Sequence, residues 1–238
     1  MPEFLKPTDD ITMYYIGVDM KYTGQDLNFI VIADTHDAFS YYYPEKMLKS
    51  LNYWGLNIDC IVLLGDHSQD DLKTIRRSYA DMDIFGVVGN HDCPEWYKKE
   101  NIEEIHLTDK SVRGYRFAGL HGCLAYKPDM TYCFSQEESI ELSDEIPECN
   151  ILITHDCYYR KPLQNPMCNE EYGLKGLSTY INAGKCDIHL HGHQHEDNIV
   201  QLKDCTSFGN YLMSVFRITN NPLDQESALI RKRIVATR

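Results

Sequence analysis

Positive charge is scarce in this sequence. Its 238 residues contain 23 lysines and arginines against 36 aspartates and glutamates, and the formal net charge is -13 at pH 7. A protein that follows the phosphates of a long nucleic acid needs a basic stripe on its surface, although bound divalent cations can reverse the sign of the charge locally. We therefore do not expect a large nucleic-acid groove.

Paired cysteines and long apolar runs are also missing. The nine cysteines include no CxxC pair and lie in apolar or mixed contexts such as IDCIVLL and ECNILIT, which favours reduced thiols in a cytosol over a disulfide framework. No stretch approaches the length of a membrane span, and the N-terminus MPEFLKPTDD has neither the basic start nor the apolar run of a signal peptide. We expect a soluble, cytoplasmic protein without a membrane partner, and the sequence does not indicate its oligomeric state.

The length and apolar content fit one folded unit. With 43% hydrophobic residues, 238 residues can bury a full core. No repeat or low-complexity linker divides the chain. We expect a single domain over residues 1–238, with residues 1–26 as a possible N-terminal hairpin extension and residues 217–238 as a C-terminal tail.

Five short apolar runs share one feature, which is that each ends in aspartate, histidine or asparagine. They are NFIVIADTHD, DCIVLLGDHS, DIFGVVGNHD, NILITHD and CDIHLHGHQH. Runs rich in valine and isoleucine, separated by helix-like stretches such as SYYYPEKMLKSLNYWG, QDDLKTIRRSYAD and GLKGLSTYINAGK, are typical of buried strands in an α/β fold. In addition, GYRFAGLHGCLAYKPDMTY suggests a hairpin or a turn-rich connection, and SFGNYLMSVFRIT a late strand. Because ligands of open α/β sheets bind beyond the carboxyl ends of the strands, the five polar ends should converge there.

These strand ends supply oxygen and nitrogen donors. The candidates are Asp34, His36, Asp66, Asn90, His91, His155, His193 and His195. Carboxylates and imidazoles suit Mn, Fe or Zn, and the absence of cysteine from the expected ligand positions favours a catalytic over a structural metal. Eight candidates are too many for one tetrahedral ion and about enough for two ions that share a carboxylate.

The motifs DTH, GDH, GNHD, TH and GHQH, in this order, resemble the five motifs of the calcineurin-like metallophosphoesterases. The resemblance runs from about Asn28 to His195 and covers most of the chain. Each motif is short, but five in order at strand ends make the match specific. The resemblance implies a four-layer αββα sandwich, in which two mixed β-sheets lie face to face with helices outside.

The resemblance also implies roles for the motif residues. One metal would be held by Asp34, His36 and His195, and the other by Asn90, His155 and His193, with Asp66 bridging. Water held between the two cations would lose a proton near neutral pH and attack the phosphate ester. His91 is not a ligand in this pattern and is the candidate to bind the phosphoryl group and protonate the leaving oxygen.

Five neighbouring residues have two interpretations each. His191 could orient a ligand or line the cleft, or be structural. His67 could face the cleft or be a polar residue at a strand end, and His121 could contact substrate or occupy a surface turn. Arg160 could bind a substrate phosphate or belong to a solvated basic pair. Asp92 could orient His91 or cap backbone amides.

The second and third motifs bear on the branch of the family. The Ser/Thr protein phosphatases continue as GDxVDRG and have GNHE, whereas this chain has GDHSQDD, with Gln69 in place of the supporting aspartate, and GNHD. This argues against a protein phosphatase and favours a similarity to the small bacterial phosphoesterases. The leading hypothesis is a dinuclear hydrolase of a small phosphodiester or nucleotide. The alternatives are a phosphomonoesterase acting on a nucleotide or sugar phosphate, and a non-catalytic binding scaffold of the same fold.

Overall fold

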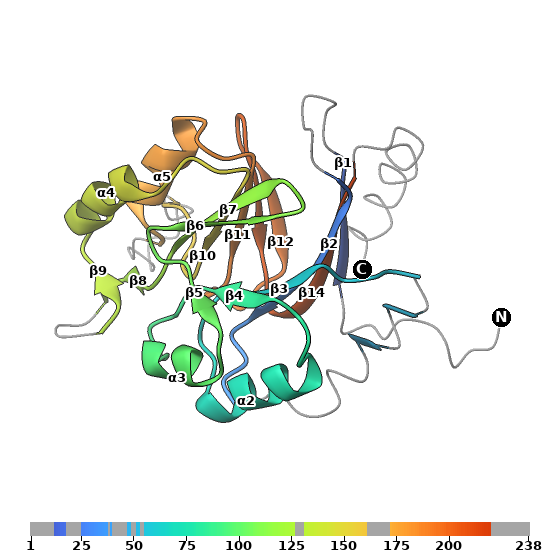
Figure 1. Cartoon of the computed structure of the whole chain (residues 1–238). Helices are drawn as coiled ribbons and strands as arrows, with labels where there is room; N and C mark the ends of the chain where they lie inside the picture. Colours follow the sequence, from blue (N-terminus) through green and yellow to red (C-terminus); the bar gives the residue numbers. More distant parts are fainter. Residues whose placement is uncertain are drawn as a thin grey trace.

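Two six-stranded mixed β-sheets form the framework of the chain (Figure 1). The computed structural model describes residues 12–17, 25–37, 39, 47–48, 51–52, 55–126, 131–160 and 172–219. All structural statements below concern these residues.

The first sheet has the strand order β1-β14-β2-β3-β4-β5. Neighbouring strands from β2 to β5 are parallel, β14 is antiparallel to β2, and β1 is parallel to β14. The strands are β1 (Thr12–Gly17), β2 (Leu27–Ala33), β3 (Cys60–Leu63), β4 (Ile84–Gly86), β5 (Glu103–Glu104) and β14 (Leu212–Thr219). The carboxyl ends of β2, β3 and β4 therefore meet at one edge.

The second sheet has the order β12-β13-β11-β10-β7-β6. Its central strands from β13 to β7 are parallel, and β12 and β6 join at the edges in antiparallel fashion. The strands are β6 (Asp109–Val112), β7 (Tyr115–Leu120), β10 (Ile151–Thr154), β11 (Ile188–His191), β12 (Asn198–Gln201) and β13 (Thr206–Gly209). A separate pair, β8 (Cys123–Leu124) and β9 (Cys133–Phe134), connects this sheet to the following helix.

Alternating side chains of the buried strands face two different layers. In β2, Val31 packs in the core between the sheets together with Phe117 of β7, whereas Ile30 points to the helices outside the first sheet. Helices α2 (Gln69–Ser78) and α3 (Pro94–Lys99) cover the first sheet, and α4 (Gln136–Glu145) and α5 (Lys175–Asn182) cover the second (Figure 1). The predicted four-layer αββα sandwich is confirmed.

The five predicted strands with polar ends are confirmed as β2, β3, β4, β10 and β11, and two predicted helices as α2 and α5. The predicted helix within residues 40–55 lies largely outside the described residues. GYRFAGLHGCLAYKPDMTY contains β7 and β8, but the hairpin partner of β7 is the preceding strand β6.

Both ends of the described chain take part in the first sheet. Near the N-terminus, the described strand β1 pairs in parallel with β14, across about 200 residues of sequence. Residues 1–11 and 18–24 lie outside the described residues, so the N-terminal hairpin stays a prediction. At the other end, β14 extends to Thr219 and takes in the first three residues of the stretch predicted as a tail. No described helix is long and apolar enough to cross a membrane.

Candidate metal centre

The polar ends of five strands converge where the carboxyl edges of the two sheets meet. The first sheet contributes Asp34 and His36 after β2, Asp66 after β3, and Asn90 and His91 after β4. The second sheet contributes His155 after β10, and His193 and His195 after β11. Parallel strands place these loops on one edge because consecutive strands start from the same side of the sheet.

The structure gathers six of these side chains into two compact donor sets. One set is Asp34, His36 and His195, and the other is Asp66, His155 and His193. In each set, one donor atom per residue lies within 4.8 Å of the others. Each set combines one carboxylate with two imidazoles, the mixture of donors that Mn, Fe and Zn accept.

Asp66 lies between the two sets. Its Oδ1 is 3.5 Å from His155 Nε2, whereas its Oδ2 is 3.6 Å from His36 Nε2. Oδ1 also accepts a hydrogen bond of 3.0 Å from the backbone N–H of His91. The two oxygens of one carboxylate thus face imidazoles of different sets.

His155 presents an unprotonated nitrogen to the centre. His155 Nδ1 is 2.7 Å from Leu64 O. Because a carbonyl oxygen can only accept a hydrogen bond, Nδ1 carries the proton, and the lone pair of Nε2 is left to bind a metal. Asn90 Oδ1 is 3.1 Å from this Nε2. His36 Nε2 and His195 Nε2 face each other at 3.2 Å, an arrangement that needs a proton or a cation between the nitrogens.

Burial of the carboxyl groups at the centre costs free energy unless positive charge compensates their negative charge. Desolvation, followed by the nearby charge of Asp66, raises the pKa of Asp34 to about 8. Burial also disfavours ionisation of Asp66, but neighbouring imidazoles, with His155 foremost, and the His91 amide hold its pKa below the usual range. Burial lowers the pKa of His155 to about 4. Two carboxyl groups buried close to each other among imidazoles form an environment that attracts divalent cations.

The backbone at the candidate ligands is unusual. Asp34, His36, Asp66, His193 and His195 all have positive φ angles, between 42° and 65°. Non-glycine residues adopt this left-handed region rarely, and such conformations cluster at functional sites.

Two glycines allow the loops after β3 and β4 to touch. A Cβ on Gly89 would collide with Asp66 Oδ1 and approach Asp66 N to 2.7 Å, and one on Gly65 would approach His155 Nδ1 to 2.7 Å. The glycines of GDH and GNHD are therefore required by the close approach of two loops that carry donor atoms.

The Asp92 carboxylate fastens these two loops together. It is 8% exposed and accepts backbone hydrogen bonds from Asp66 N at 2.8 Å, His67 N at 2.6 Å and Gly89 N at 2.7 Å. Of the two sequence interpretations of Asp92, backbone capping is the one observed.

Two further carboxylates connect the loops to their surroundings. Asp71 of α2 accepts hydrogen bonds from Thr35 Oγ1 at 2.7 Å and from the backbone N–H groups of Asp37 and Phe39. Asp156 accepts from Leu124 N at 2.9 Å. Sequence analysis missed Asp71, whose only sequence signal is its place among the acidic residues of the first helical turn.

His91 lies at the exposed side of the centre. Its ring is 5.5 Å from that of His36, and within the described chain the ring makes no hydrogen bond that would fix it elsewhere. The ring is thus available to an incoming ligand.

The sequence offered four candidate substrate contacts, and the structure does not bring them to one place. They are His67, His121, His191 and Arg160. His67 is 1% exposed, with Nδ1 2.9 Å from Thr35 Oγ1. His121 is bonded through Nδ1 to Glu104 and stacks on His106 with ring centroids 3.4 Å apart.

His191 and Arg160 occupy another region. His191 is fully buried and, like His189, points to the helix-covered face of the second sheet, because Leu190 between them packs in the core between the sheets. Arg160 packs over the ring of Tyr158. Burial is the main cause that lowers the pKa of both histidines, and the charge of Arg160 adds to it. The described positions of His67, His121 and His191 fit structural roles.

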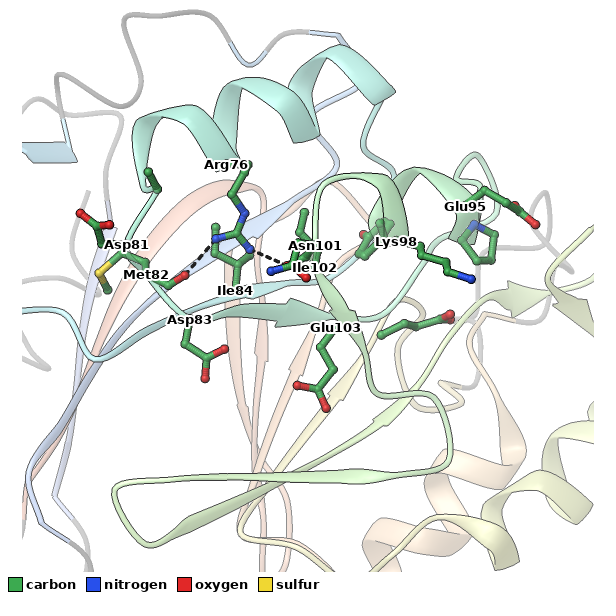
Figure 2. Close-up of a pocket in the computed structure, with 14 residues that line it drawn as sticks. Arg76, Asp81, Met82, Asp83, Ile84, Glu95, Lys98, Asn101, Ile102 and Glu103 are labelled. Carbon is green, nitrogen blue, oxygen red and sulfur yellow. Dashed lines mark hydrogen bonds between the residues drawn. The ribbon is translucent and has the colours of Figure 1, made fainter.

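One cavity among the described residues lies away from the donor sets. A space of about 830 Å³ opens between α2, α3 and the β4–β5 edge (Figure 2). None of the candidate ligands is among its lining residues. The guanidinium of Arg76 donates to Met82 O and Asn101 O across this space, so its hydrogen bonds hold the surrounding segments together.

The fold and the two donor sets define an α/β protein with a double candidate metal centre between two sheets. A family model described as calcineurin-like phosphoesterase matches residues 27–197, well over half of the chain. The chain belongs to the calcineurin-like phosphoesterase family and is a phosphoric ester hydrolase, a class that uses divalent metals.

Three solved structures are similar to this chain at low sequence identity, and the first of them shows the same fold. A provisionally named 5'-nucleotidase from Staphylococcus aureus, in complex with alpha-ketoglutarate, is 12% identical with a TM-score of 0.52, and the match covers 88% of this chain but only 58% of that one. An archaeal phosphodiesterase is 17% identical, with a TM-score of 0.46 and coverage of 78% and 84%. Phosphopantetheinyl hydrolase from Mycobacterium tuberculosis is 12% identical, with a TM-score of 0.48 and coverage of 80% and 91%. Among curated proteins, none matches.

Proposed function

We propose that this chain is a two-metal phosphoesterase that hydrolyses a small phosphodiester or nucleotide. Asp34, His36 and His195 would hold one ion, and Asn90, His155 and His193 the other, with Asp66 shared. The position of Asp66 carries the proposal, because its two oxygens lie 3.5 and 3.6 Å from imidazoles of different donor sets.

The donor set fits divalent cations and phosphate chemistry. Ions bound there would supply Lewis acidity, which lowers the pKa of water and neutralises negative charge on the phosphoryl group. Two observations support His91 as the proton donor to the leaving oxygen: its exposed ring lies 5.5 Å from that of His36, and its backbone N–H is bound by Asp66.

The surroundings of the centre favour a monoanionic ester. The strongest influences on the pKa values of Asp34 and Asp66 are burial, neighbouring carboxylates, imidazoles and backbone N–H groups. The sequence offered Arg160 as the clamp for a dianion, and its Nε and Nη2 are buried in the region of His189 and His191. A phosphomonoester would meet no arginine fork among the described residues at the centre, whereas a diester carries one charge less.

Hydrolysis by protein stripped of metal with a chelator, then supplied singly with Mn, Fe, Zn or Mg, tests this proposal. We expect negligible turnover without metal, recovery with at least one ion, and a higher kcat/KM on an aryl phosphodiester than on the matching monoester. Activity that persists after complete metal removal would refute the two-metal proposal. A monoester preference with every restoring ion would refute the substrate ranking.

A further inference from the structure

Two pairs of thiols lie almost in contact outside the donor sets. Cys123 Sγ and Cys133 Sγ are 3.5 Å apart, and Cys186 Sγ and Cys205 Sγ are 3.7 Å apart. All four cysteines are free. A disulfide bond is roughly 2.05 Å long, so these are reduced thiols that already neighbour each other.

The first pair already has the backbone geometry of a disulfide. Cys123 of β8 and Cys133 of β9 are direct register partners. Neighbouring strands are about 4.8 Å apart, within the range of roughly 4.4–6.8 Å between the Cα atoms of disulfide-bonded cysteines. Backbone hydrogen bonds of 3.1 Å from Cys123 N to Tyr132 O and 2.9 Å from Ala125 N to Phe134 O hold the strands in place. The two sulfurs, 3.5 Å apart, lie about 1.5 Å beyond the length of a disulfide bond.

The two thiols differ in access and in chemistry. Cys123 is fully buried, whereas Cys133 is partly exposed. Burial raises the pKa of Cys133, but the hydrogen bond with the Cys123 thiol opposes that rise. Cys133 is therefore the sulfur that a dissolved reagent can reach, and Cys123 lies behind it.

This pair borders the candidate metal centre. The residue before Cys123, Gly122, donates its backbone N–H to Val88 O at 2.9 Å, and Val88 directly precedes the GNHD motif that carries Asn90. The residue after Cys123 donates its backbone N–H to Asp156, which directly follows His155.

We propose that Cys123 and Cys133 form a reversible thiol–disulfide modification site on the wall of the metal centre. The oxidant is a low-molecular-weight disulfide such as oxidised glutathione. The Cys133 thiolate attacks one sulfur of this disulfide, forms a mixed disulfide and releases one thiolate. Cys123, after losing its proton, attacks the Cys133 sulfur, which closes the intramolecular bond and expels the second thiolate. The two protons lost by the cysteines end on the two released thiols, and the two protein thiols are oxidised as the glutathione disulfide is reduced.

The second pair provides a matched comparison within the same chain. Cys186 and Cys205 are 3% and 1% exposed and precede β11 and β13, at the opposite end of the sheet from the donor sets. The two sulfurs of this second pair are about as close as those of the first pair, but a dissolved oxidant cannot reach them. We therefore do not expect them to react.

The test exposes the folded full-length chain to oxidised glutathione and maps disulfides by mass spectrometry after alkylation of the remaining thiols. We expect a Cys123–Cys133 bond to form first, with the loss of two free thiols, and dithiothreitol to reverse it. The Cys123→Ser variant should accumulate a stable mixed disulfide at Cys133, whereas Cys133→Ser should form neither product. Cys186→Ser should form the Cys123–Cys133 bond at the parent rate.

Two results would overturn the proposal. One is oxidation of Cys186 and Cys205 ahead of the proposed pair. The other is a Cys123–Cys133 bond that forms no faster in the folded chain than in the chain unfolded in urea, because the proposal depends on the folded register of β8 and β9. Circular dichroism of each variant before treatment ensures that the folded state is being compared.

Discussion

Removal of the Asp92 carboxylate should both destabilise the fold and loosen the metal centre. Asp92 Oδ2 accepts from Asp66 N and Gly89 N, while Oδ1 accepts from His67 N. In Asp92→Ala, three buried N–H groups lose their acceptor, and each unsatisfied group costs about 1–3 kcal/mol. We expect the free energy of unfolding to fall by about 3–6 kcal/mol, since partial relaxation and water entry reduce the sum.

The Asp92→Asn variant separates shape from charge. An asparagine that keeps its oxygen at the Oδ2 position still accepts the hydrogen bonds from Asp66 N and Gly89 N. Its NH₂ group then faces His67 N, so about one hydrogen bond should be lost, which costs about 1–3 kcal/mol. Urea denaturation of the chelator-treated protein measures both variants. The exposed Asp70→Asn on α2 is the control and should leave the urea midpoint unchanged.

The same variants should bind metal more weakly, measured as the ion retained per chain after dialysis, because Asp66 and Asn90 lie on the loops that Asp92 joins. If Asp92→Ala unfolds at the parent urea midpoint, the three backbone hydrogen bonds do not hold these loops and the argument fails.

Three other perturbations test the centre and its neighbourhood. Asp66→Asn should lower the occupancy of both metal sites together by elemental analysis, and loss of one ion with full retention of the other would contradict sharing. His193→Ala should reduce metal content, whereas His91→Ala should keep it and reduce turnover on the order of 10²–10⁴-fold, less for good leaving groups; an unchanged rate on an alkyl diester would exclude His91 as the acid. Burial and the charge of His121 lower the pKa of His106 to about 4, so the unfolded chain binds more protons between pH 6.5 and 4. Stability from His106 is therefore present above pH 6.5 and lost as the pH falls towards 4, and the urea midpoint of His106→Gln should decline less over this range than that of the parent.

The order of strands and loops could be predicted because buried parallel strands carry a local signal. Continuous runs such as CIVLL have no polar face, and each was followed at once by the residues that the fold gathers at its edge. The parallel pairing of β1 with β14 had no such signal, because it joins residues that are distant in sequence and leaves no spacing to detect.

Side-chain direction explains which site residues could be predicted. His189 and His191 share one face of β11, as expected from the strand period, but the sequence did not indicate that this face is the one covered by helices. His67 follows Asp66 directly, yet its ring is enclosed against Thr35, because direction within a loop depends on φ and ψ rather than on position in a motif. The contacts of Asp71 with the loop after β2 depend on how α2 packs against that loop. The sequence does not indicate this packing, so it could not predict these contacts.

The left-handed backbone at five candidate ligands is supported by hydrogen bonds that the chain itself makes. Each such conformation costs on the order of 1–3 kcal/mol for a non-glycine residue and persists only where the surroundings enforce it. Here the enforcing contacts are made by the protein itself, since Asp34 accepts the backbone N–H of His193 at 2.9 Å and Asp92 accepts that of Asp66 at 2.8 Å. Without these hydrogen bonds the loops would be free to relax to ordinary φ angles. The strain is thus balanced by buried hydrogen bonds within the chain, which hold the candidate donor atoms in their positions.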